Sequence, residues 1–482
     1  LKPCWPKAPA CTMLVPLNVA RRRGVAMHHG VLVAVAAASS FIGGADGRSV
    51  RAAVEGLVQG QPMKEKFPWY HTTSEIRQEL QDLSATCQGA DVELTTRSRV
   101  NSANAAGEEI ELDVLHIRKG GIKPRTRALY VFGEHARELV SPESALDFLR
   151  TLCGRGRESE HAAAVLENVE FTVVPNANPL GRQQVEEGYY CKRTNEDGVD
   201  LNRNWGDDHR EHAAMRSGDE MDPGPSGFSE PESQILRDLV AEVKPDVFLS
   251  IHSGAYLLGA PYGYTAASVP ENEASMVDIL KPISEKYCAG GCPYGGLADL
   301  IGYQSEGCAI DYVAEHLQTP FAYTWEIYVG PEIRKHYIAE ARDRASPSGS
   351  DMSDSDDDFF RAQKLNLAEL SSRRSSQQRW DQKHLRGAHQ ARHRAHSATR
   401  IALGEFAERP EAEQDPEDCI EQFVPRTAEE TAQIVDNWTG AYLDLAEQVS
   451  ARQEQKRGDK AVSVVANKDS LQTDGAALTS PF

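Results

Sequence analysis

The sequence predicts an α/β fold, a mixed, mostly parallel, twisted sheet with helices on both faces. Segments typical of strands and of helices alternate through most of residues 67 to 342, as in domains built on a largely parallel sheet. One segment, residues 245 to 251, is a continuous apolar run of the kind found in strands buried on both faces. The 482 residues are enough for one domain of about 300 residues with appendages, although two to four domains also fit the length.

The first predicted elements cover residues 73 to 174. Thr73 or Ser74 can cap a helix that runs to residue 87, and strands are expected over 108 to 117 and 127 to 133. A helix from 141 to 152 begins with Pro142 and Glu143, which are favoured in a first turn. A strand over 169 to 174 follows.

The later elements repeat this alternation. They are a helix over 230 to 243, the apolar strand 245 to 251, a helix over 273 to 288 that Pro282 should kink or split, and a strand over 321 to 329. Residues 426 to 448 return to helical periodicity, with an apolar face formed by Ile434, Trp438, Tyr442 and Leu445. We expect this closing helix to pack on the sheet.

The N-terminal residues predict a secreted protein or one in the lumen of the secretory pathway. In a leader region of residues 1 to 45, Arg21 to Arg23 precede an apolar run at 31 to 38 and small residues at 43 to 45, the layout of a signal peptide. Met13 and Met27 are possible starts. An uncleaved anchor and an Ala-rich stretch without function are the alternatives, and no segment is long enough for a stable membrane span. Residues 46 to 66 form a short polar lead.

The amino-acid composition divides the C-terminal part of the chain into three segments. Residues 343 to 414 hold a Ser/Asp run and an Arg/His/Gln-rich stretch with few apolar residues, which predicts a disordered insertion. Its histidines can bind metal loosely, but a solvated segment is the simpler interpretation. The closing helix occupies 415 to 450, and a disordered tail is expected from 451 to 482.

Charge and cysteine content narrow the function classes. A formal charge of −20 argues against a nucleic-acid partner, which requires a basic face. Nine cysteines are too few for a disulfide scaffold. Cys288 and Cys292 either close a small disulfide loop or remain free thiols, and Cys191 and Cys419 have no obvious partners, so that a bond between them stays open.

Two histidines and a carboxylate point to a metal site. His135 and Glu138 lie three residues apart after an apolar run, and His252 directly follows another. Two imidazoles and one carboxylate with an open fourth position are a ligand set for one catalytic Zn²⁺. All three, together with Glu326, fall near carboxyl ends of predicted strands, where sheets of this type bind ligands.

Further motifs occur in a characteristic order. Residues 192 to 195 read Lys-Arg-Thr-Asn, residues 202 to 205 Asn-Arg-Asn-Trp, and Glu326 lies within a predicted strand. With the histidine motifs, this set resembles the zinc carboxypeptidase family of carboxypeptidase A-like metallopeptidases over residues 68 to 330 and again at 415 to 450. Within the family, the motif sequences are most similar to those of a little-studied branch found in plants and protists. The resemblance implies a carboxypeptidase-like fold, with 67 to 342 as catalytic domain, and zinc-dependent hydrolysis at the C-termini of peptides or proteins.

The resemblance also implies a role for individual residues. Glu326 would be the general base, although a Glu in this position can also be an ordinary edge carboxylate, and Arg193 would stabilise the oxyanion, in preference to Lys192 because Thr194 and Asn195 follow. The remaining matches are substrate-binding residues: Asn202 and Arg203 for the terminal carboxylate, Tyr303 as a mobile cap, and Arg137 as an auxiliary contact. Without the family, residues 202 to 204 read as a surface turn.

The predicted substrate specificity depends on which residue of this chain aligns with the floor of the family's specificity pocket. Ile310 matches the floor of the family's pocket and Thr324 another wall, which predicts a preference for apolar C-terminal residues. A shift by one residue would place Asp311 there and select Lys or Arg. Gly254 and Ala255 depart from the bulkier residue of digestive enzymes, so the neighbouring subsite should differ.

Two rival functions share parts of this pattern. Zinc deacylases of N-acyl amino acids have the same metal motif but lack the full Asn-Arg and Tyr set. A carboxypeptidase-like binding module would lack a ligand or the base, whereas His135, Glu138, His252 and Glu326 are all present. The complete set therefore favours an active enzyme.

Overall fold

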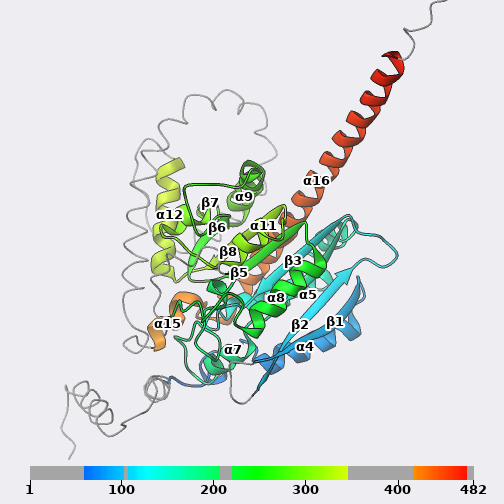
Figure 1. Ribbon diagram of the computed structural model, residues 1–482. Coiled ribbons are helices and arrows are strands. Elements are labelled where there is room, and N and C mark those ends of the chain that lie inside the picture. Colours follow the sequence, from blue (N-terminus) through cyan, green and yellow to red (C-terminus); the bar gives the residue numbers. More distant parts are fainter. Residues whose placement is uncertain (1–58, 102–106, 207–219, 346–415, 475–482) are drawn as a thin grey trace, which may run out of the picture. The chain divides into compact units, whose positions relative to one another are not determined.

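A computed structural model describes residues 59–101, 107–206, 220–345 and 416–474. They fold around an eight-stranded sheet of order β1-β2-β4-β3-β5-β8-β6-β7 (Figure 1). Its strands are β1 (Asp91–Val100), β2 (Glu109–Arg118), β3 (Thr126–Phe132), β4 (Val169–Val174), β5 (Val247–His252), β6 (Ala255–Ala260), β7 (Tyr294–Gly296) and β8 (Phe321–Tyr328).

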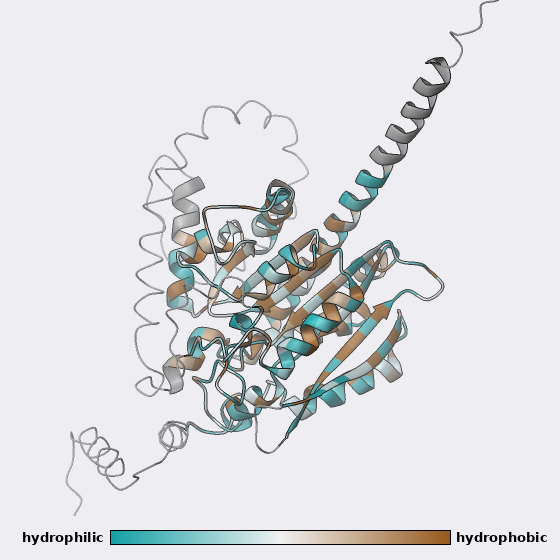
Figure 2. Cartoon of the chain, in the orientation of Figure 1, coloured by the Kyte–Doolittle hydropathy of each residue, from teal (hydrophilic) through white to brown (hydrophobic). Residues whose placement is uncertain are grey.

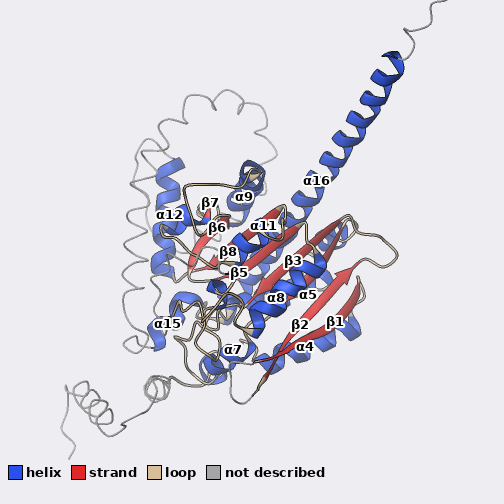
Figure 3. Ribbon diagram, viewed as in Figure 1, coloured by secondary structure: helices blue, strands red, loops and turns tan. Residues whose placement is uncertain are grey.

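The sheet is mixed. Four of its seven pairings are parallel, namely β3 with β4, β3 with β5, β5 with β8, and β6 with β7. The pairs β1 with β2, β2 with β4, and β6 with β8 are antiparallel. The predicted fold class is confirmed, and Figure 3 shows the strands with helices on both sides. Because β3, β5 and β8 are parallel neighbours, their carboxyl ends lie together.

Helices cover both faces of this sheet. They are α3 (Met63–Lys66), α4 (Thr73–Thr86), α5 (Val140–Leu152), α6 (Ser159–Val165), α7 (Pro179–Glu186), α8 (Pro231–Val243), α9 (Glu273–Tyr287), α10 (Leu297–Ile301), α11 (Ala309–Glu315), α12 (Pro331–Ala345), α15 (Pro416–Phe423) and α16 (Ala428–Asp474), with a 3₁₀ turn η1 (Leu201–Arg203). One face carries α5, α9 and α16, and the other carries α8 and α11. The central strands are the most hydrophobic part of the chain in Figure 2.

The predicted closing helix packs as expected. Ile434, Trp438, Tyr442 and Leu445 of α16 are all buried. The Tyr442 ring meets Tyr130 and Phe148 edge-on at centroid distances of 6.1 and 5.6 Å. The Trp438 indole donates a hydrogen bond of 2.8 Å to the Ile327 carbonyl, which satisfies a polar group inside the core.

Three expected features differ in the structure. Thr72, not Thr73 or Ser74, caps α4, because its hydroxyl accepts from the Glu75 amide (3.1 Å) while the Glu75 carboxylate accepts from the Thr72 amide (2.8 Å). Helix α9 runs unbroken through Pro282, whose ring lies on the exposed side where water can take the lost hydrogen bond. Strands β1, β6 and β7 were not expected; β1 is an edge strand rich in polar residues.

The helix α16 continues to Asp474, well past residue 450, so most of the expected disordered tail is helical. Residues 451 to 457, just beyond the buried part of the helix, read Ala-Arg-Gln-Glu-Gln-Lys-Arg, all of which have high helix propensity. The leader region of residues 1 to 45 and nearly all of the insertion lie outside the described residues, as do residues 475 to 482. Within the described residues, no helix is both long and apolar enough to span a membrane.

Three disulfides join described cysteines. Cys288 bonds Cys292 and Cys191 bonds Cys419, which settles both open questions of the sequence in favour of disulfides. A third bond, between Cys87 and Cys153, was not expected. Cys308 is a buried free thiol in the described part of the chain. The bond between Cys191 and Cys419 ties the segment before Arg193 to helix α15.

Candidate active site

The carboxyl ends of β3, β5 and β8 bring the predicted metal and base residues together. His252 is the last residue of β5, and it pairs in register with Glu326 of β8. Residues two apart in a strand share a face, so Ser250 and His252 lie on the same side of the sheet as Thr324 and Glu326. His135 follows the end of β3 by three residues, in a tight loop before α5.

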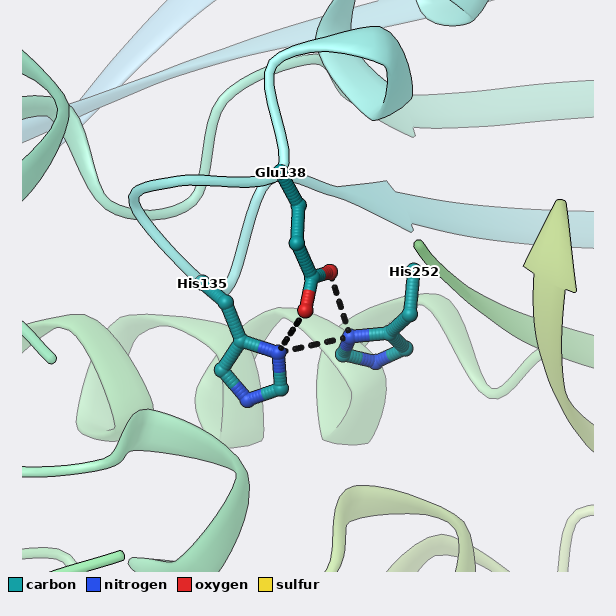
Figure 4. A group of neighbouring side chains, drawn as sticks. All are labelled: His135, Glu138 and His252. Atoms are coloured by element: carbon teal, nitrogen blue, oxygen red, sulfur yellow. Dashed lines mark hydrogen bonds and ion pairs between the residues drawn. The ribbon is translucent and has the colours of Figure 1, made fainter. Parts of the chain in front are cut away.

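His135, Glu138 and His252 converge on one point (Figure 4). The two Nδ1 atoms lie 3.1 Å apart, and the Glu138 carboxylate oxygens lie 2.6 Å from His135 Nδ1 and 3.1 Å from His252 Nδ1. Ligand atoms about 2.0–2.1 Å from a tetrahedral zinc are separated by roughly 3.3 Å, close to these spacings. All three side chains are buried. Both the donor types and their spacing therefore fit Zn²⁺.

Asp200 orients the first histidine. Its Oδ1 lies 3.1 Å from His135 Nε2, and its Oδ2 accepts a 2.8 Å hydrogen bond from Arg193 Nε. A carboxylate on Nε2 keeps the proton there and leaves Nδ1 free to bind metal. Burial opposes ionisation, but Arg193 and His135 outweigh it and hold the pKa of Asp200 well below its usual value. The role of Asp200 was not predicted from the sequence, although Asp200 directly precedes the Leu-Asn-Arg-Asn segment.

Glu326, the predicted general base, lies in β8 beside His252. Its Oε2 accepts a hydrogen bond from the Ala255 amide at 3.3 Å, which fixes one oxygen and leaves the other for a reacting group. Burial, together with the negative charge of Glu138, raises the pKa of Glu326 to about 7. A carboxylate with a pKa near the operating pH can both take and return a proton.

Arg193 lies beside the three candidate metal ligands. Its Nη1 lies 3.9 Å from Glu138 Oε1, and its Nε is held by Asp200. Burial disfavours the charged guanidinium, yet Asp200, Glu138 and Glu220 raise the pKa of Arg193. The site thus keeps a fixed positive charge beside the ligand triad.

Asn202 and Arg203 are buried in η1, so the interpretation of residues 202 to 204 as a surface turn is wrong. The Asn202 side-chain oxygen Oδ1 accepts from the Ala309 amide at 2.9 Å, and its Nδ2 lies 3.3 Å from His252 Nε2. Gly307 makes this burial possible, because a Cβ there would lie 2.2 Å from the Arg203 carbonyl oxygen. The predicted carboxylate-binding pair is therefore adjacent to the metal site.

The predicted cap and pocket residues lie nearby. Tyr303 is 51% exposed, in the segment between α10 and α11, and it lies near Arg193 and Arg203. Ile310 is buried in the first turn of α11. The Thr324 hydroxyl contacts the Ser250 carbonyl at 3.5 Å inside the sheet.

Arg137 is more enclosed than its predicted substrate role requires. Its guanidinium donates to the Cys191 carbonyl at 2.9 Å, pairs with Glu220 at 2.9 Å, and stacks on the Phe423 ring at 4.2 Å. These contacts join the metal loop to the Cys191 segment and to α15. Substrate binding by Arg137 stays a prediction, whereas its bracing role is visible.

The profile described as "Zinc carboxypeptidase" matches residues 86–343, more than half of the chain. Zinc carboxypeptidase A 1 of Anopheles gambiae is 27% identical over 288 residues, which are 55% of this chain and 61% of that protein. The Drosophila melanogaster protein of the same name is 30% identical, over 40% and 47% of the two chains. Carboxypeptidase A2 of Mus musculus is 28% identical, over 54% and 63%. The chain thus spans roughly half to two thirds of these relatives.

Solved structures give weaker similarity. Thrombin activatable fibrinolysis inhibitor aligns with a TM-score of 0.48 at 22% identity, over 53% of this chain and 66% of that one. Carboxypeptidase A from Helicoverpa armigera aligns with a TM-score of 0.46 at 21% identity, over 71% and 74%.

Proposed function

Because this chain belongs to the zinc carboxypeptidase family, we propose that it is a zinc-dependent metallocarboxypeptidase that hydrolyses the C-terminal peptide bond of peptides or proteins. The observation that supports this most directly is the convergence of His135, Glu138 and His252 beside Glu326 and Arg193. Ligands, base and fixed cation are the groups that hydrolysis of an amide by a metallopeptidase requires.

The proposed ligands are His135, Glu138 and His252, with one Zn²⁺ per chain. When bound, zinc polarises the substrate carbonyl and lowers the pKa of water at the open position toward about 7. Glu326 takes the proton of the attacking water and returns it to the departing amine. Arg193 stabilises the negative charge that develops on the carbonyl oxygen, and its link to Asp200 holds it in place beforehand.

Asn202 and Arg203 are proposed to bind the free carboxylate of the substrate. A guanidinium pairs with a carboxylate through two parallel hydrogen bonds, which makes a chain terminus the preferred substrate. Arg203 is almost fully buried and its Nε has no hydrogen-bond partner in the described structure. A buried cation with an unused donor is suited to an anionic ligand.

We also propose that the enzyme prefers apolar C-terminal residues. The Asp311 carboxylate accepts hydrogen bonds from the Gly263 and Tyr264 amides at 2.9 and 3.0 Å, and Asp311 is buried. With its oxygens committed to backbone amides, it is poorly placed to pair with a basic substrate side chain. Ile310 remains the candidate for the pocket floor, where hydrocarbon would leave a Lys or Arg desolvated and unpaired.

A panel of N-blocked dipeptides that differ only in the last residue tests this preference. Wild type should cleave Phe and Leu termini fastest, and Ile310→Asp should shift the preference toward Lys and Arg. Asp311→Ala serves as the matched variant at the neighbouring position. If wild type prefers basic termini and Asp311→Ala removes that preference, the register is off by one and Asp311 is the pocket residue.

Three disulfides among the described cysteines support a proposed location in the secretory pathway or outside the cell, because disulfides persist in oxidising compartments. Fractionation of cells that express the full chain tests this: the protein should be recovered from the medium or lumen, and recovery in reduced form from the cytosol would contradict it.

A further inference from the structure

Glu134 is a buried carboxylate that the proposed reaction does not use. It precedes His135, but its side chain turns toward the other histidine, His252. It is only 1% exposed, and its Oε1 has no hydrogen-bond partner in the described structure. Burying an ionised carboxylate costs several kcal/mol unless charge and hydrogen bonds compensate, so its position requires a compensating partner.

The compensating partners lie around the Nε2 atom of His252. Glu134 Oε2 lies 3.3 Å from this nitrogen. The Ser250 hydroxyl lies 2.7 Å from the same nitrogen and also donates a short hydrogen bond to Glu134 Oε2. Ser250 and Glu134 are thus both positioned to accept the Nε2 proton, and the serine hydroxyl connects the carboxylate to the ring.

The two histidines of the site therefore have parallel arrangements. His135 presents Nδ1 to the ligand triad and Nε2 to Asp200. His252 presents Nδ1 to the same triad and Nε2 to Ser250 and Glu134. A carboxylate behind a metal-bound imidazole fixes its ring orientation and tautomer and increases its basicity toward the metal.

We propose that Glu134, acting with Ser250, is a positioning residue that orients His252 and strengthens its bond to zinc. This inference rests on the zinc site of the proposed function, although not on its peptidase activity. In the zinc-bound protein the Nε2 proton of His252 points to Ser250 and Glu134, and Nδ1 carries the metal. The positive charge at the site in turn compensates the buried Glu134 carboxylate.

The test measures zinc affinity of the full-length chain, by competition of the metal-free protein with a chromophoric chelator. Glu134→Gln keeps the shape of the side chain and removes its charge, and we expect the zinc Kd to rise about 10- to 100-fold. Glu143→Gln is the matched control, since Glu143 is also buried but pairs with His71 at 2.7 Å. Its zinc Kd should equal that of wild type.

A purely structural role predicts a different pattern. In that case Glu134→Gln would lower the melting temperature of the metal-free protein and leave zinc affinity unchanged. The coupling between Glu134 and Ser250 gives an independent readout. Ser250→Ala alone should raise the zinc Kd by a smaller factor than Glu134→Gln does. In the Ser250→Ala background, Glu134→Gln should change the zinc Kd less than it does in wild type. If Glu134→Gln does not fold, Ser250→Ala and Glu134→Asp carry the test, with Kd elevated in both.

Equal zinc affinity in wild type and every folded Glu134 and Ser250 variant would overturn the inference. Failure of the proposed function is distinguishable, because a chain that binds zinc tightly but cleaves no peptide would contradict the peptidase assignment and leave the role of Glu134 intact. Cobalt substitution adds a spectroscopic check. The visible absorption bands of the cobalt-loaded protein should shift in Glu134→Gln and not in Glu143→Gln.

Discussion

His252 is the residue on which most of the site depends. It contributes a ligand atom to the triad and contacts Ser250, Glu134 and Asn202 through its other nitrogen. We expect His252→Ala to lose bound zinc and to reduce kcat/KM by more than about 100-fold, since even outer partners of metal ligands are worth about 10- to 100-fold. Metal analysis of purified protein and an assay after added zinc check this. Full peptidase activity in His252→Ala protein would remove it from the ligand set.

Glu326 should control the acidic side of the pH profile. Its pKa is raised to about 7 without metal, and the positive charge of zinc favours the ionised form, so the acidic limb of kcat/KM should lie below that value. A base acts when deprotonated, so the rate rises with pH through this pKa and then levels off. Glu326→Gln should lower kcat about 100- to 10,000-fold while zinc and peptide binding remain. Near-normal turnover in Glu326→Gln, or a rate that falls between pH 5 and 7 in wild type, would contradict this role.

The three candidate metal ligands, which the structure brings together, could be picked out from the sequence, but their hydrogen-bond partners could not. His135, Glu138 and His252 are recognisable because spacing and neighbouring apolar runs are local features of the sequence. Asp200 contacts the His135 ring from 65 positions away, and Glu134 contacts the His252 ring from 118 positions away. Both contacts depend on how distant segments align in the folded sheet, which the sequence does not show locally. Burial of Asn202 likewise follows from the close approach of Gly307, which no local pattern reveals.

Helix α15 is held against the site by several independent contacts. The Phe423 carbonyl accepts from Ser253 at 2.8 Å, the Phe423 ring lies under Arg137, and Cys419 is bonded to Cys191. Gly254 leaves room for that ring, because a Cβ at this position would lie 2.4 Å from it. The departure at Gly254 noted in the sequence is therefore matched by an aromatic side chain from a distant element.

The bond between Cys191 and Cys419 should stabilise the folded chain. It links residues 228 positions apart, and closing so long a loop restricts the unfolded state. The Cys191→Ala, Cys419→Ala double variant should lose about 2–4 kcal/mol of unfolding free energy. The matched control removes Cys288 and Cys292, only four positions apart, and should lose less. Denaturant unfolding of both variants measures the difference, and equal losses would contradict the argument.

Elements with a strong pattern were predicted well. Residues 169 to 174 form β4 at the expected bounds, and the apolar face of α16 is buried. The edge strand β1 was missed because its exposed positions carry polar side chains, and β6 because it directly follows the histidine motif with only two residues between strands. The helical part of the expected tail was missed because residues 451 to 457 have high helix propensity but no apolar periodicity.

At the scale of the whole molecule, the insertion should be dispensable for the metal site. The segment before α12 and helix α15 are already joined without the insertion, since the Gly330 amide donates to the Gln422 carbonyl at 3.0 Å. Replacing residues 346 to 410 by a Gly/Ser linker long enough to reach from the end of α12 to the start of α15 should leave zinc content and kcat/KM within about twofold of wild type, because the segment has too few apolar residues to contribute a core. Activity and circular dichroism test this. Failure of that variant to fold would make the segment structural.

The alternation of strands and helices was sufficient to predict the fold class, because a helix between two strands favours parallel pairing of those strands. Parallel strands in turn place their carboxyl ends at the same edge of the sheet. It did not reveal the order of the sheet or its antiparallel edges, which depend on contacts between distant segments. The motif set adds what alternation lacks, since it requires β3, β5 and β8 to be neighbours for His135, His252 and Glu326 to meet.

The most direct test of zinc-dependent carboxypeptidase activity is mass spectrometry of a defined peptide incubated with the zinc-loaded full chain, with the same peptide amidated at its C-terminus as control. We predict loss of a single C-terminal residue from the free acid, no cleavage of the amide, loss of activity in chelator and recovery with zinc. Cleavage of both peptides at equal rates, cleavage at internal bonds, or hydrolysis of N-acyl amino acids without any peptide cleavage would contradict the account.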